Sequence, residues 1–242
     1  MAATGEASGT GGGAATKYTL AVDLGTGGPK VALVSMEGDV VGHEYETNQL
    51  IFFPEWGVEQ DPDDWWNAIT TGAKKLIARN LVPVDDIVAF SVTAQWMGTI
   101  AVDETGQHLA NALIWMDARG AKYAGKWVGG GIEAPTTGYN AKKLYKWVSM
   151  TGGLPSRTGK DPVGHILWLK HEKPEIYAAA HKLLDVPDYL NMRLTGRACA
   201  SYDSIVGYWC TDNRDLSNVE YKDELIALCG FDRAKLPDLV PT

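Results

Sequence analysis

Apolar and polar residues alternate along the early part of the chain, and this alternation predicts strands. Residues 18–23 (YTLAVD) and 30–35 (KVALVS) both show it, with a Gly-rich turn between them. A second turn at residues 37–39 leads to a third strand over residues 40–47. Short strands joined by tight turns are typical of an antiparallel meander.

The alternation then gives way to helical spacing. Asp61 precedes a proline and two further aspartates, which is the composition of a helix N-terminus. Apolar residues follow at intervals of three and four, at Trp65, Ile69, Ala73, Leu76 and Ile77. Residues 84–92 predict a fourth strand and residues 98–102 a fifth. The pattern therefore indicates an α/β fold, with a mixed five-stranded sheet flanked by helices.

The second half of the chain is mainly helical in its pattern. We predict helices over residues 141–150, 162–171, 174–180, 188–194 and 221–228, and Gly196 suits a left-handed cap after the fourth of them. Residues 237–242 predict a loop. Since no internal repeat or long linker interrupts the pattern, we expect one domain over residues 17–242, after a disordered leader over residues 1–16 that is rich in Gly, Ala, Thr and Ser.

Composition and charge narrow the class of protein. Hydrophobic residues make up 45% of the 242, which favours a globular chain over a disordered one. The formal charge of −8 argues against nonspecific binding to nucleic acid or to an anionic membrane surface. No apolar run approaches the roughly 18 residues of a membrane span. Three cysteines without CxxC spacing favour neither a disulfide framework nor a zinc site, so we expect a cytoplasmic protein.

The Gly-rich turn after the first strand carries the strongest chemical signal. Glycines let the backbone approach an anion closely and present consecutive N–H groups to it. Thr26 adds a hydroxyl donor, Lys30 adds positive charge, and Asp23 can hold Mg²⁺ directly or through water. The turn matches neither a Walker A motif nor a dinucleotide fingerprint, because a strand rather than a helix follows it. An ordinary hairpin turn that uses glycine for positive φ remains the alternative.

Eight short segments, in a fixed order and at characteristic spacing, carry a resemblance to a known family. They are DLGTGGPK at 23–30, WGVEQDP at 56–62 with WW at 65–66, QWMG at 95–98, DETG at 103–106, IWMDAR at 114–119, LWLK at 167–170 with PE at 174–175, DYL at 188–190 with LTG at 194–196, and LP at 236–237. Together these segments resemble the FGGY family of carbohydrate kinases. The resemblance covers nearly all of the chain after the leader.

The resemblance implies a ribonuclease-H-like, actin-like fold and an ATP-dependent kinase that phosphorylates a sugar or polyol, with xylulose-like pentuloses favoured. It implies ATP and Mg²⁺ as cofactors, and Asp23 near the metal and the γ-phosphate. The phosphates would lie against Gly25, Thr26, Gly27, Gly28 and Lys30. The sugar pocket would be formed by Gln95, Trp96, Met97, Trp115 and Asp117, although we favour for Asp117 an ion pair with Arg119 that braces the pocket wall.

Departures from the family pattern qualify this expectation. Family members carry the catalytic base, an aspartate, in a Gly-rich segment after the L-P pair, and the chain shows no such segment. Asp203 and Asp212 lie outside any Gly-rich loop and are poor substitutes. The resemblance thus implies that the base and a C-terminal nucleotide domain are missing, and that the chain alone has little or no kinase activity. Met97 stands where many pentulose kinases have histidine, and His165 stands where a lysine is common. We expect His165 to be a partly exposed helix residue.

Two other functions stay open. One is a noncatalytic carbohydrate-binding or regulatory module that kept the pocket, and the other is a structural partner of a separately encoded nucleotide domain. A hydrolase and a dinucleotide oxidoreductase are disfavoured, since HExxH and GxSxG are absent and the glycine turn opens a strand. Because the surface that faces a second domain would be open, we also expect self-association, including a homo-oligomer.

Overall fold

The fold begins with a four-stranded sheet. The computed structural model describes residues 16–242, so the predicted leader lies outside the described residues apart from its last position. Strands β1 (Tyr18–Gly25), β2 (Gly28–Ser35) and β3 (Val40–Tyr45) pair antiparallel, and β6 (Ile87–Ala94) pairs parallel with β1. The order is β3-β2-β1-β6, and the predicted meander is confirmed.

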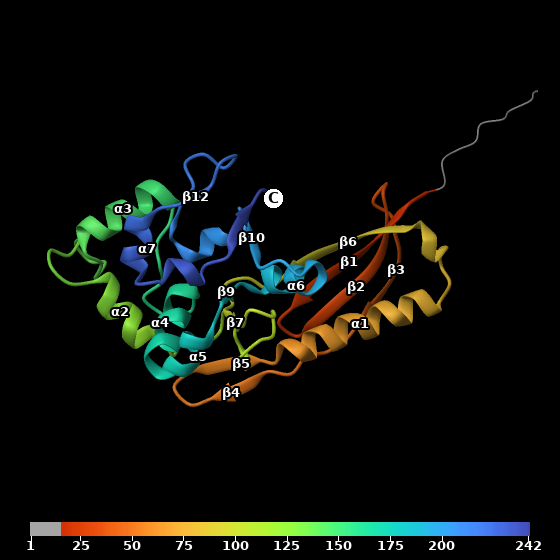
Figure 1. Ribbon diagram of the computed structural model, residues 1–242, viewed down its shortest axis with the longest axis horizontal. Helices are drawn as coiled ribbons and strands as arrows, with labels where there is room; N and C mark the ends of the chain where they lie inside the picture. The colour runs from red at the N-terminus through yellow and green to blue at the C-terminus, as the bar shows by residue number, and fades with distance from the viewer. Residues whose placement is uncertain (1–15) are drawn as a thin grey trace, which may run out of the picture.

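Helix α1 (Pro62–Ala78) packs along one face of this sheet (Figure 1). Asp61 accepts a hydrogen bond from the Asp63 amide and caps the helix, as the sequence predicts. Trp65, Ile69 and Leu76 are at most 2% exposed and join the core of this half. Each such side chain contributes roughly 1.5–3 kcal/mol by its burial, which holds the helix on the sheet.

The predicted fifth strand does not belong to this sheet. It forms β7 (Ile100–Val102), which pairs antiparallel with β9 (Lys182–Leu184). The reason lies just before it, where Met97 has φ 64° and the amides of Met97 and Gly98 donate to the Asp185 carboxylate. This arrangement turns the chain away from the sheet after β6. Within residues 16–242, the five strands expected for the main sheet are therefore corrected to four.

The remaining strands are short. They are β4 (Ile51–Phe53), β5 (Gly57–Gln60) and β8 (Ala112–Leu113) in one small sheet, the parallel pair β10 (Cys199–Ser201) and β13 (Asp238–Val240), and the antiparallel pair β11 (Thr211–Asp212) and β12 (Glu220–Tyr221). Strand β13 occupies a segment predicted to be a loop. Its partner β10 is distant in sequence, so local composition does not reveal the pairing.

The second half of the chain is mainly helical, as predicted. Its helices are α2 (Ala121–Val128), α3 (Ala141–Thr151), α4 (Pro162–Glu172), α5 (Pro174–Ala179), α6 (Val186–Thr195) and α7 (Asp223–Cys229), with 3₁₀ turns at Ile205–Tyr208 and Arg233–Lys235. A further 3₁₀ turn, at Val84–Asp86, lies in the first half and occupies the start of the segment predicted as the fourth strand. Gly196 ends α6 at φ 72°, the predicted left-handed cap. Helix α2 was not predicted, because no side chain caps its start.

Two hydrophobic cores meet at the β7–β9 pair, which lies between the main sheet and the helical half (Figure 1). Ile100, Val102 and Leu184 belong to the core shared with the sheet, α1 and α6, whereas Ala101 and Leu183 belong to the helical core. Alternate side chains of one short ladder thus face different cores, as strand geometry requires. Among the helices of residues 16–242, none is long and apolar enough to cross a lipid bilayer.

Helix α4 lies very close to the loop that precedes α2. A Cβ added to Gly120 would lie 2.2 Å from the Gly164 carbonyl oxygen, and one added to Gly164 would lie 2.3 Å from the Gly159 carbonyl oxygen. Only glycine permits backbones to approach this closely. The contact holds the segment that ends with Arg119 against the helical half.

Candidate active site

The turn between β1 and β2 is a tight hairpin whose shape depends on glycine. Gly25 pairs with Gly28, which leaves Thr26 and Gly27 at the tip. Gly28 has φ 142°, and a Cβ there would lie 1.9 Å from the Glu46 carbonyl oxygen. A side chain at position 28 would therefore be excluded both by conformation and by space.

The hairpin presents groups that suit an anion and a metal ion. Within the described part of the chain, the amides of Thr26 and Gly27 have no hydrogen-bond partner. Asp23 and Lys30 face each other across the strands, with 3.1 Å between Oδ2 and Nζ, and their side chains are 51% and 64% exposed. So exposed a pair contributes little to stability and stays accessible to a ligand. An accessible carboxylate is the kind of oxygen ligand that Mg²⁺ takes together with water.

A hollow of about 490 Å³ opens beside the hairpin, and both halves of the chain line it. Trp96 and Trp115 are 42% and 45% exposed, so broad aromatic faces are open to a ligand. The C–H face of a sugar is apolar and packs on such faces. The lining residues are Gln95, Trp96, Met97, Trp115, Ser156, Lys160, Asp161 and Trp209. The structure thus brings together four of the five predicted sugar-pocket residues.

The hollow contains one buried carboxylate whose oxygens are already used. Asp161 caps α4 by accepting from the Gly164 amide at 3.1 Å, and it also accepts from the Ser156 amide at 2.5 Å and from Trp209 Nε1 at 3.1 Å. Burial raises the pKa of Asp161. Lys160, in contrast, is exposed and makes no ion pair with any described residue.

Gln60 is fully buried at the end of β5 and joins the hollow to the hairpin. Its Nε2 donates to the Thr26 carbonyl oxygen at 2.8 Å and to that of Gln49 at 3.3 Å. Its Oε1 accepts from Gln95 Nε2 at 2.6 Å and from Trp65 Nε1 at 3.3 Å. Both N–H donors and both lone pairs of the amide are therefore satisfied.

The Thr26 hydroxyl completes this set of bonds. It donates to Gln95 Oε1 at 3.0 Å and accepts from Trp115 Nε1 at 2.9 Å. The sequence predicted this hydroxyl as a donor to phosphate, but it already bonds two residues of the hollow. The main-chain amide of Thr26 is therefore the group of this residue that remains available to an anion.

Asp185 fixes the segment that carries Trp96 and Met97. It is fully buried, and its carboxylate accepts from the amides of Met97 at 3.1 Å, Gly98 at 2.7 Å and Val186 at 2.7 Å. These bonds hold Met97 in its left-handed conformation, which is uncommon for a residue with a side chain. Burial raises the pKa of Asp185 to about 7.

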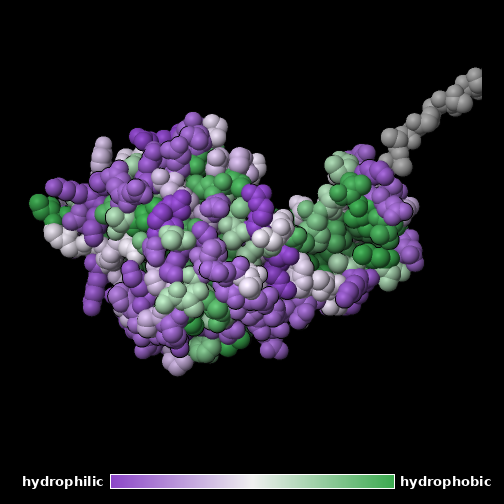
Figure 2. All heavy atoms as spheres, viewed as in Figure 1, coloured by the Kyte–Doolittle hydropathy of each residue, from purple (hydrophilic) through white to green (hydrophobic). Residues whose placement is uncertain are grey.

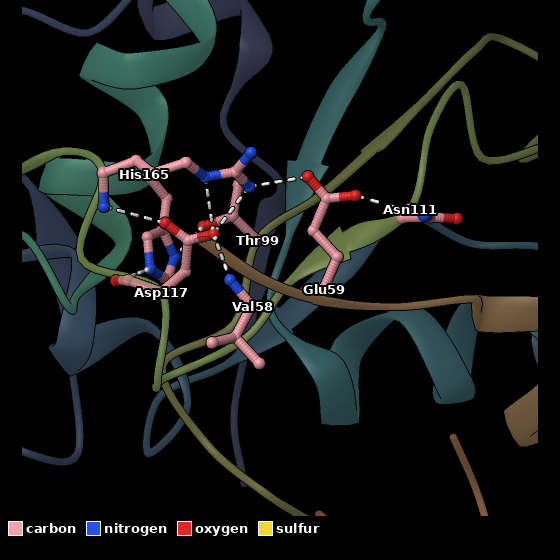
Figure 3. A network of polar contacts seen from close by, with 7 residues as sticks. Val58, Glu59, Thr99, Asn111, Asp117 and His165 are labelled. Atoms are coloured by element: carbon pink, nitrogen blue, oxygen red, sulfur yellow. Dashed lines mark hydrogen bonds and ion pairs between the residues drawn. The ribbon is translucent and has the colours of Figure 1, made fainter. Parts of the chain in front are cut away.

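Asp117 does not line the hollow, and it belongs to a network of polar contacts (Figure 3). It is 0% exposed, and Oδ2 accepts from the Val58 amide at 2.9 Å and from Arg119 Nε and Nη2 at 2.9 and 2.6 Å. Arg119 also pairs with Glu59 at 2.6 Å and lies 3.9 Å from the Trp168 ring centroid. The geometry favours the bracing interpretation of Asp117 over contact with a ligand.

The prediction that His165 is partly exposed is wrong, since the residue is 0% exposed. Its Nε2 lies 3.2 Å from the Asp117 carbonyl oxygen and its Nδ1 lies 3.3 Å from Thr99 Oγ1 (Figure 3). Because a carbonyl only accepts, Nε2 carries the proton and Nδ1 accepts from Thr99. Burial lowers the pKa of His165 to about 4, so the ring is neutral at pH 7. Helix α4 is buried on nearly all sides and therefore has no amphipathic pattern from which the burial of His165 could be predicted.

The chain belongs to the FGGY family of carbohydrate kinases, because the model of this family's N-terminal domain matches residues 18–242. The predicted family is therefore confirmed. Among its relatives, a xylulose kinase of Escherichia coli (strain K12) is 28% identical over 222 residues, and a gluconokinase of Bacillus licheniformis is 27% identical over 235 residues. These alignments cover 91% and 94% of this chain but only 41% of each relative. The chain thus spans about two fifths of the length of the relatives it matches.

Solved structures confirm the predicted fold class. A xylulose kinase from Rhodospirillum rubrum superposes with a TM-score of 0.77 at 19% identity, over 93% of this chain and 43% of that one. A Plasmodium falciparum glycerol kinase with ADP superposes with a TM-score of 0.74 at 18% identity, over 93% and 43%. At these identities, the likeness establishes the actin-like sugar-kinase fold alone.

Several residues of the site were missed from the sequence. Gln60 lies within a recognised segment but had no assigned role, because its four partners come from separate parts of the chain. Lys160 and Asp161 reach the hollow from the turn before α4, and Trp209 reaches it from a turn with φ 56°. No local pattern brings these segments together. The only available signal was the capping position of Asp161 before Pro162.

Proposed function

We propose that this chain forms the sugar-binding half of an ATP-dependent sugar or polyol kinase, with a pentulose such as xylulose favoured. The observation that carries the proposal is the contact between hairpin and hollow, since Thr26 bonds both Gln95 and Trp115. A sugar stacked on Trp115 would lie next to amides that suit a phosphate, and such proximity is what phosphoryl transfer demands. The xylulose kinases among the relatives support a pentulose, and the gluconokinases and glycerol kinases keep other polyols in view.

The hairpin residues fit both cofactors. When bound, ATP supplies the phosphoryl group and Mg²⁺ neutralises its charge. The Thr26 and Gly27 amides would hold phosphate oxygens, and Lys30 would add positive charge. Asp23 would hold the metal, through water, with the carboxylate oxygen that Lys30 leaves free.

We further propose that the 242-residue chain alone transfers phosphate slowly or not at all. Among the described residues that line the hollow, Asp161 is the only carboxylate, and three N–H groups already bond it. A general base typically contributes on the order of 10²–10⁴-fold. The same observation favours a second candidate function, a noncatalytic carbohydrate-binding module. Turnover of a sugar by the purified chain would exclude the slow-transfer proposal and this alternative together.

The first test is a titration of xylulose, ribulose, xylitol, ribitol and glycerol followed by tryptophan fluorescence. Saturable quenching by a sugar is the expected result, because Trp96 and Trp115 line the hollow. Trp96→Ala should weaken binding by at least tenfold. Trp56→Ala is the matched control, since Trp56 is 83% exposed and lies outside this hollow. Equal loss in both variants, or no response to any sugar, would contradict the proposal.

A further inference from the structure

The hairpin and the hollow share one connected set of hydrogen bonds, which we call the Gln60 relay. Its members are Thr26, Gln60, Gln95 and Trp115. Thr26 enters the relay twice, through its carbonyl to Gln60 and through its hydroxyl to Gln95 and Trp115. No member of the relay can therefore shift without disturbing a bond at the hairpin tip.

We propose that Gln60 is a positioning residue that couples the two parts of the site. A sugar in the hollow fixes the hairpin for phosphate, and phosphate on the hairpin tightens the hollow around the sugar. The inference rests on the proposed function, because it requires both ligands to bind.

The geometry supports coupling in both directions. A ring stacked on Trp115 restrains the indole, whose Nε1 is 2.9 Å from Thr26 Oγ1, and so restrains the hairpin tip. An anion on the Thr26 amide restrains the same residue, and its carbonyl holds Gln60 Nε2 at 2.8 Å. Gln60 passes that restraint to Gln95, which lines the hollow. Gln60 is 0% exposed, so water cannot replace a lost partner, and the buried amide resists any shift that would break one of its bonds.

If the role of Gln60 were purely structural, its substitution would lower the stability of the fold without changing the coupling between the two ligands. Its bond to Trp65 ties it to the core, so any substitution will lower stability. Coupling is a separate quantity, because it compares the affinity for one ligand with and without the other and is reciprocal by thermodynamic necessity.

The experiment is calorimetric titration of xylulose into the whole purified chain, with and without saturating magnesium pyrophosphate as the phosphate probe, and the reverse titration. For the wild type we expect each ligand to lower the Kd of the other by about tenfold, within the usual range of coupling. In Gln60→Met, which conserves side-chain length but removes all four hydrogen bonds, the factor should fall to about one, whatever the change in the Kd for xylulose alone. Gln49→Met is the control, since its side chain is exposed and outside the relay; it should keep the wild-type factor.

A second pair of variants covers failure of Gln60→Met to fold. Thr26→Val removes the hydroxyl and should reduce the coupling factor. Thr26→Ser keeps a hydroxyl at this position and should keep the wild-type coupling factor. Wild-type coupling in Gln60→Met or in Thr26→Val would overturn the inference. So would a wild type that binds xylulose with the same Kd whether or not pyrophosphate is present. If xylulose and the other sugars fail to bind at all, the proposed function itself is wrong, and the inference is overturned with it.

Discussion

At the scale of single residues, Asp185 links the stability of the fold to pH. Burial raises its pKa to about 7, so between pH 4 and 7 the folded chain holds a proton that the unfolded chain has released. This residue therefore makes stability fall as pH rises through that window, by at most about 1.4 kcal/mol per pH unit. Asp185→Asn does not titrate, so we expect its stability relative to wild type to increase from pH 4 to 7. Urea unfolding at several pH values measures this difference.

His165 should act in the opposite sense. Its pKa is lowered to about 4 by burial, so between pH 4 and 6.5 the unfolded chain binds a proton that the folded chain does not. Stability from this residue is complete above pH 6.5 and is lost as pH falls toward 4. His165→Gln should lose stability at pH 7 but show a smaller further loss at pH 4.5 than wild type. A pH slope equal to that of wild type would show that His165 is accessible to protons in the folded state.

At the scale of elements, the β4–β5 hairpin contains local strain. Glu55 and Trp56 at its tip have φ 59° and 65°, and the Gly57 amide donates to the Pro54 carbonyl at 3.2 Å, the pattern of a type I′ turn. Such turns favour Asn-Gly, because other residues pay a steric cost for positive φ. The double variant Glu55→Asn with Trp56→Gly should therefore raise the free energy of unfolding by about 1–2 kcal/mol. Thermal and urea unfolding measure it, with Glu55→Ala as the variant that keeps the strain.

The elements also show what a sequence can and cannot predict. The meander, the Asp61 cap and the Gly196 cap followed from the chain because periodicity, side-chain capping and positive φ are local properties. Strand β7 was predicted as a strand but assigned to the wrong sheet, because its path depends on Asp185, which is far away in sequence. The hollow was half predicted for the same reason. Gln95, Trp96 and Met97 form one contiguous segment, whereas Lys160 and Trp209 arrive through packing of the helical half.

At the scale of the whole molecule, one edge of the main sheet is open. Strand β6 pairs only with β1 among the described strands, and Val88 and Phe90 on it are 56% and 37% exposed. Figure 2 shows apolar surface over this sheet lobe. An unpaired edge with exposed apolar side chains favours association between copies.

We expect the chain to self-associate at micromolar concentrations, as light scattering after size exclusion will measure. Val88→Lys should shift it toward monomer, because a lysine on an edge strand opposes pairing. Val148→Lys is the matched control, since Val148 is 49% exposed on α3, far from this edge in the fold. A wild type that stays monomeric at high concentration would contradict the prediction.

The close approach of Gly120, Gly159 and Gly164 limits the substitutions that the gene can tolerate at these positions. Each of these backbones occupies the space that a neighbour's methyl group would need. In a library of all single-codon changes, we expect positions 120 and 164 to be depleted as strongly as those of the hollow, although neither lines it. A map of tolerated variants would thus mark two clusters in this region, and one of them would record how closely two backbones pass rather than any chemistry.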